Sequence, residues 1–81
     1  MSGSVLPSAL KVISNSIRRV IIQLLSEEKM TYIELLSSIG LDFDRHRGWF
    51  NYHLDVLLDE GIVSKDQDHY VLTEFGKKLA S

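Results

Sequence analysis

The fold is decided by residues 50–72, FNYHLDVLLDEGIVSKDQDHYVL, because the spacing of the apolar residues changes within them. The apolar positions up to Leu57 follow helical spacing, and Gly61 is a residue type that commonly ends a helix. Two short β-prone runs follow, residues 62–65 and 70–72, with a polar segment between them. This pattern predicts a helix followed by a β-hairpin.

Two amphipathic helices are expected in the N-terminal part of the chain. The first spans about residues 6–13, where Pro7 suits an opening turn. The second follows the cap-forming residues 14–16 and has apolar residues at helical spacing from Ile17 to Leu25. Arg18 and Arg19 are expected on a solvated face of this helix, and the alternative for them is a positioning contact with the DNA backbone. The first helix carries two apolar lines, one of Leu6, Ala9, Leu10 and Ile13 and one of Val5 and Val12. Because a single small core does not need both lines, we expect this segment to pack partly against a second subunit.

A third helix is expected over residues 31–39. Thr31 and Glu34 have the spacing of a capping box, in which each side chain accepts a hydrogen bond from the other residue's backbone N–H. Gly40 suits the left-handed position after a helix end, and Leu41 can fold back as the accompanying apolar contact.

The fourth helix is expected to begin with Asp42 or Asp44 as its N-cap and to run to Glu60. After the hairpin, Thr73 is expected to cap a short last helix. The predicted fold is therefore mainly α with a small β-hairpin, in the order helix, helix, helix, helix, strand, strand, helix.

Composition limits the classes of protein that fit. The 81 residues suit one domain, residues 1–81, and the absence of cysteine leaves no disulfide framework and no thiolate metal site. The longest apolar runs are triplets and the N-terminus lacks the features of a signal peptide, so we expect a cytoplasmic protein without membrane contact. The net charge of −2 means that any basic surface must be local.

Helices followed by a hairpin are typical of the winged form of the helix-turn-helix. The residues that carry a more specific likeness are Leu10, Ser14, Asn15, Arg18, Tyr52, His53, Leu54, Leu57, Gly61, Ile62, Val63, Tyr70, Leu72 and Thr73. In this order they resemble the ArsR-type winged-helix regulators, especially the short archaeal members, over about residues 8–80. The resemblance implies a homodimeric regulator, a repressor in most members, that binds double-stranded DNA with the fourth helix in the major groove and the wing near the backbone.

Two departures from the family pattern affect what the resemblance implies. Residues 41–49 form a longer stretch than the family has there, which leaves the start of the recognition helix open. The cysteine-bearing metal-sensing motif is absent, so thiolate metal sensing is not implied. We expect neither a metal ion nor another cofactor.

The candidate DNA-binding residues lie mostly around the start of the fourth helix. Arginines there can reach phosphates or a guanine edge, although Asp42 and Asp44 could instead neutralise them. Trp49 and Tyr52 can present apolar edges and a hydroxyl to DNA, unless the preceding residues fold back and bury Trp49. The alternatives for Asn51 and His53 are a DNA contact or a packed, hydrogen-bonded position. The full set is Arg45, His46, Arg47, Trp49, Asn51, Tyr52, His53 and, on the hairpin, Lys65.

Enzyme chemistry finds no support in the sequence. The chain has no glycine-rich phosphate loop, no G-x-S-x-G motif and no cysteine nucleophile, so we expect no enzymatic activity. The alternative function is a winged-helix module for protein interaction within a larger assembly, which the acidic balance and the acidic hairpin favour.

Overall fold

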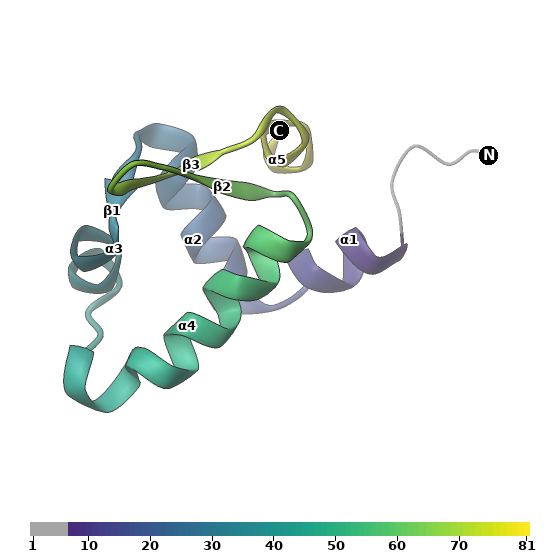
Figure 1. Ribbon diagram of the computed structural model, residues 1–81. Coiled ribbons are helices and arrows are strands. Elements are labelled where there is room, and N and C mark those ends of the chain that lie inside the picture. The colour runs from purple at the N-terminus through teal and green to yellow at the C-terminus, as the bar shows by residue number, and fades with distance from the viewer. Residues whose placement is uncertain (1–6) are drawn as a thin grey trace.

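The computed structural model describes residues 7–81, which form five helices and a three-stranded antiparallel sheet (Figure 1). The helices are α1 (Pro7–Ile13), α2 (Ser16–Glu27), α3 (Tyr32–Ile39), α4 (Phe43–Asp59) and α5 (Glu74–Ala80), and the strands are β1 (Met30–Thr31), β2 (Val63–Asp66) and β3 (His69–Leu72). The prediction of a mainly helical protein with a small β element is thus confirmed. Among the described helices, none has the length and apolar character needed to cross a membrane.

Local hydrogen bonds set the helix ends, largely as the sequence predicts. The Asn15 side chain caps α2 by accepting hydrogen bonds from two backbone N–H groups of its first turn. The capping box at the start of α3 is confirmed: the Glu34 N–H donates to Thr31 Oγ1, and the Thr31 N–H donates to the Glu34 carboxylate. At the other end of α3, Gly40 has a φ of 84°, and the Leu41 N–H donates back to the Leu36 carbonyl.

The predicted two-stranded hairpin is only part of the sheet. The two-residue strand β1 lies between α2 and α3, where the sequence predicts only the helix cap at Thr31, and it pairs with β3. Met30 is opposite Tyr70, and Thr31 is opposite His69. The strand order is therefore β1-β3-β2, with β3 in the centre.

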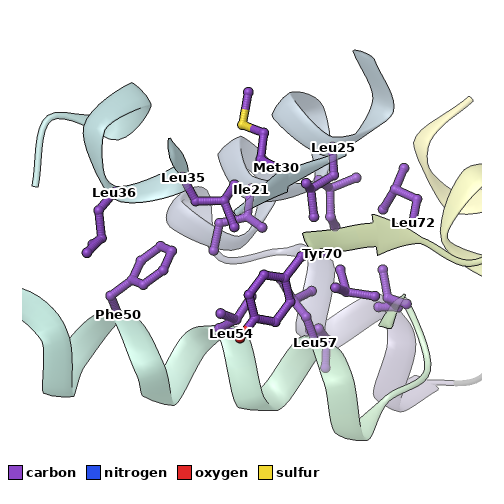
Figure 2. Packing of buried hydrophobic residues seen from close by; sticks show 14 residues of the cluster. Ile21, Leu25, Met30, Leu35, Leu36, Phe50, Leu54, Leu57, Tyr70 and Leu72 are labelled. Atoms are coloured by element: carbon purple, nitrogen blue, oxygen red, sulfur yellow. The ribbon is translucent and has the colours of Figure 1, made fainter. Parts of the chain in front are cut away.

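The core lies between α2, α3 and α4 and continues onto one face of the sheet. Figure 2 shows Phe50, Leu54 and Leu57 along α4, opposite Leu35 and Ile21 from α3 and α2. Phe50 and Leu57 are completely buried, which confirms that this face of α4 packs inward. The opposite face of α4 is left for other contacts.

In the structure, the two apolar lines of α1 do not separate the core residues from the exposed ones. Val12, expected on a line beyond the core, is buried in it, whereas Leu10 is 54 % exposed. Val12 turns inward because it packs with the cluster that α2 builds, a contact that the spacing within α1 alone does not reveal. Val5 and Leu6 lie outside the described residues.

The last helix is held against the start of β2. Thr73 caps α5 as predicted, accepting a hydrogen bond from the Gly76 N–H, and its hydroxyl donates to the Gly61 carbonyl at 2.6 Å. A Cβ added to Gly76 would lie 2.2 Å from the Ile62 carbonyl oxygen, so the two backbones touch at this point. A side chain at position 76 has no room.

Candidate functional site

The first two turns of α4 reach beyond the core. Residues 42–49 are exposed apart from the half-buried His46, and Phe50 is the first buried residue of the helix. In Figure 1 this end of α4 lies away from α2 and the sheet. Residues 43–49 thus form the first turns of a helix rather than a loop.

The projecting end is built on a set of local hydrogen bonds. Asp42, one of the two predicted caps, accepts a hydrogen bond from the Asp44 N–H through its side chain. Its own N–H donates to His46 Nδ1 at 3.0 Å, and the His46 N–H donates to the Asp42 carbonyl at 2.8 Å. His46 therefore has a local role in ordering the start of α4, and Nδ1 is occupied by that role.

Two arginines lie on this end of α4. Arg45 and Arg47 are both exposed, and within residues 7–81 neither forms an ion pair with Asp42 or Asp44. The Arg47 guanidinium carbon lies 5.2 Å from the centre of the Phe43 ring, a distance typical of a cation–π contact. Both positive charges remain available to an external anion.

Trp49 and Tyr52 are exposed large side chains on the next turns of α4. Trp49 is 49 % exposed and Tyr52 60 %, so the alternative in which Trp49 folds back and is buried is not observed. Positions 45, 49 and 52 are separated by four and three residues, a spacing that brings them onto one face of a helix. This face carries a cation beside two aromatic rings.

His53 occupies the boundary between this face and the core. It is only 6 % exposed, and its Nδ1 accepts a hydrogen bond from the Arg18 Nε–H at 3.0 Å. Burial, and secondarily the positive charge of Arg18, lower the pKa of His53 below its usual 6.5. The structure matches the packed, hydrogen-bonded alternative for this residue, and a side chain so buried has little surface to offer DNA.

The solvated position expected for Arg18 is wrong. Arg18 is half-buried, and besides His53 it binds the Val12 carbonyl through Nη1 at 3.2 Å. The sequence gives no local signal for this role, because the hydrogen bond to His53 joins positions 35 residues apart. Arg19, in contrast, is exposed as expected.

The remaining candidates lie away from the Arg45, Trp49 and Tyr52 face. Asn51 is exposed on the flank of α4, where its Oδ1 accepts a hydrogen bond from the Tyr32 hydroxyl. Burial raises the pKa of that hydroxyl, so it remains a donor throughout the neutral range. Lys65 is exposed on β2 with its Nζ 5.6 Å from the Tyr70 ring, on a different element from the other candidates.

A shallow depression separates the start of α2 from α4. It is lined by Asn15, Ser16, Ile17, Val20, Trp49 and His53. Val20 is 42 % exposed there, which makes the depression partly apolar.

Among residues 7–81, no group of three or more histidine and acidic side chains is placed to hold a metal ion.

Comparison with known proteins gives a family without an assigned activity. A family model described as a domain of unknown function (DUF7347) matches residues 7–81, which include all the helices and strands described above. No curated protein and no solved structure matches the chain significantly.

Proposed function

We propose that this chain, which belongs to the DUF7347 family, binds double-stranded DNA sequence-specifically as a transcriptional regulator of the winged helix-turn-helix type. In this proposal α3 and α4 are the helix-turn-helix, α4 enters the major groove, and the β2–β3 hairpin is the wing near the backbone. The observation that carries the proposal is the exposed N-terminal part of α4, where Arg45 and Arg47 form no ion pair within residues 7–81 and the aromatic side chains of Trp49 and Tyr52 are exposed.

The chemistry of this half of α4 suits the groove of a duplex. The major groove of B-DNA admits a helix, and recognition helices contact base edges mainly through their N-terminal residues. The positive end of the helix dipole adds to Arg45 and Arg47 in attracting phosphate. Asp55 and Asp59 are exposed further along α4 and would be repelled by phosphates, as would the exposed Asp42 and Asp44 at its start. The contact is therefore expected from the arginine and aromatic side chains between them rather than from the whole helix.

A homodimer completes the proposal. Two copies would place two recognition helices on neighbouring half-sites, and the exposed Leu10 on α1 supplies apolar surface for a subunit contact. We assign repression to the regulator because its sequence resembles the ArsR-type winged-helix regulators. The proposal includes no catalytic step, no cofactor and no metal ion.

The test is a titration with random duplex DNA at about 50 mM and about 200 mM salt. If Arg45, Arg47 and Lys65 each neutralise one phosphate, log K should fall with log salt with a slope of about −2.7 per protomer. The affinity per protomer should then drop about 40-fold between the two conditions. Absence of binding at the lower salt concentration would refute the proposal.

One pair of variants locates the contact. Arg47→Ala should weaken binding by about 1–3 kcal/mol and make the salt slope shallower by about 1. Glu28→Ala changes an exposed charge in the segment that joins α2 to β1, and it should leave affinity unchanged. Equal effects of the two substitutions would show that α4 is not the contacting helix.

The second candidate function is a module for protein interaction within a larger assembly. It is favoured by the partly apolar depression beside Val20 and Trp49, and by the net charge of −2. Such a module would show no salt-dependent affinity for duplex DNA. The titration described above therefore separates the two functions.

A further inference from the structure

We propose that Arg18 is a positioning residue for the exposed face of α4, and that protonation of His53 releases it, so that DNA binding weakens in mildly acidic solution. The DNA part of this inference rests on the proposed function. The release of Arg18 does not, and it can be measured without DNA.

Arg18 joins three helices through one guanidinium group. From its place in the first turns of α2, Nε–H donates to His53 Nδ1 of α4 at 3.0 Å, and Nη1–H donates to the carbonyl of Val12 in α1 at 3.2 Å. Val12 and His53 are both buried, whereas Arg18 is half-buried. A planar group with two bonds in fixed directions sets an orientation that a single bond would not.

His53 in turn supports the exposed aromatic side chains of α4. Its ring meets the Trp49 ring edge-on, with centroids 5.2 Å apart and an interplanar angle of 88°. It meets the Tyr52 ring in the same manner at 5.2 Å and 69°. The Arg18 guanidinium carbon also lies 6.0 Å from the centre of the Tyr52 ring. The two aromatic side chains of the proposed contact face therefore rest on the Arg18–His53 pair.

The hydrogen bond requires a neutral histidine. Because Nδ1 accepts from Arg18, the ring must carry its only proton on Nε2. A second proton would go to Nδ1 and face the N–H of a guanidinium that stays charged throughout the accessible pH range. Two donors and two positive charges would then meet at a buried position, so protonation must displace Arg18.

No neighbouring group compensates for that charge. Arg18 is the one charged residue, within residues 7–81, that acts on the pKa of the His53 ring. From α2, the residues that share the depression with His53 are the uncharged Asn15, Ser16, Ile17 and Val20. On α4 itself the ring packs edge-on against the aromatic rings of Trp49 and Tyr52. Protonation of the His53 ring thus acts on its contact with Arg18.

Trp49 is the only tryptophan of the chain and reports on this step directly. An imidazolium quenches indole emission more than a neutral imidazole does, so emission should fall in one step as the pH decreases from about 8 to about 5. His53→Gln keeps an acceptor for Arg18 but does not titrate, and it should abolish the step. Both proteins are titrated in a His46→Gln background, because the centroid of the His46 ring also lies near that of Trp49, at 6.4 Å, and an imidazolium there would quench the same indole. In that background the step should be present with His53 and absent with His53→Gln.

Removal of the cation should move the midpoint. In Arg18→Gln the positive charge beside His53 is gone, so the emission step should shift upward toward pH 6.5. Circular dichroism at both ends of the titration checks that each variant is folded. A step that survives in His53→Gln, or a midpoint that is the same in Arg18→Gln and the wild type, would overturn the inference.

The DNA measurement compares the wild type with His53→Gln at about pH 7.5 and about pH 5.5. His53→Gln lacks the ring against which Trp49 and Tyr52 pack, so it should bind more weakly than the wild type at the higher pH. The wild type should lose affinity several-fold between the two pH values, whereas the variant should not show this loss. Arg18→Lys keeps the charge but not the two-bond geometry, and should lower affinity at the higher pH, whereas Arg19→Lys on the exposed side of α2 should not.

The two failures are distinguishable. Equal pH dependence of DNA binding in the wild type and His53→Gln would reject the inference and leave the proposed function standing. Absence of DNA binding by every protein at every pH would reject the proposed function and the DNA part of the inference together. The emission step would then still decide whether Arg18 is released from His53.

Discussion

Substitution of Gly76 by alanine should destabilise the protein through a single backbone contact. The new Cβ would lie 2.2 Å from the Ile62 carbonyl oxygen, 3.1 Å from the Ile62 carbonyl carbon and 3.2 Å from its Cγ2. A carbon and an oxygen normally stay more than 3 Å apart, so α5 must move by roughly 1 Å. That movement strains the hydrogen bonds of Thr73 that hold α5 on the start of β2. Overpacking of this kind costs about 1–3 kcal/mol.

The matched control is Gly48→Ala. Gly48 lies on the exposed part of α4, and a Cβ there would meet nothing within 4 Å. Alanine is better than glycine in a helix interior by about 1 kcal/mol, so this variant should gain stability. Thermal unfolding followed by circular dichroism should give a lower Tm for Gly76→Ala, by about 4–8 °C per kcal/mol, and a higher Tm for Gly48→Ala. If Gly76→Ala is as stable as the wild type, α5 does not rest on Ile62 as described.

Three further variants test the cap, the contact face and the subunit contact. Glu34→Ala should lose stability relative to the wild type above pH 4.5, because the Thr31 N–H lowers the pKa of the Glu34 carboxyl. This loss should disappear as the pH falls through that lowered pKa. Urea unfolding at several pH values measures it, and a difference in unfolding free energy between the two proteins that is the same at every pH would contradict the prediction. Because Trp49 is exposed, Trp49→Ala should lower the free energy of unfolding by less than the roughly 3 kcal/mol typical of a buried aromatic, and it should weaken DNA binding. If unfolding and binding assays show that neither stability nor DNA affinity changes, Trp49 contributes to neither. Light scattering should give twice 9.2 kDa for the wild type and a smaller mass for Leu10→Asp, and a wild-type mass of 9.2 kDa at high concentration would exclude the homodimer.

The elements that the sequence predicts correctly are those with local causes. The ends of α3 follow from the capping box at Thr31 and from the left-handed Gly40, and both act within a few residues of the chain. The apolar spacing of α4 likewise places Phe50 and Leu57 in the core. Such features depend on backbone geometry and periodicity, which a single sequence contains.

What the sequence does not predict depends on residues far apart in the chain. The strand β1 has two residues, too few for an alternating pattern, and it exists because Met30 and Thr31 pair with β3. The inward position of Arg18 depends on His53, and no spacing rule links them. At the candidate site the sequence identified the exposed residues of α4 but not the pair that supports them.

The position of β3 in the sheet has a consequence for synthesis of the protein. Both β1 and β2 pair with β3, although β3 is the last of the three strands to leave the ribosome. Until Tyr70 and Leu72 are available, a nascent chain that already contains α2, α3 and α4 has no partner for Met30 and an incomplete core. Apolar surface that stays uncovered in an incomplete chain favours aggregation, so we expect stable folding only once β3 is available to pair.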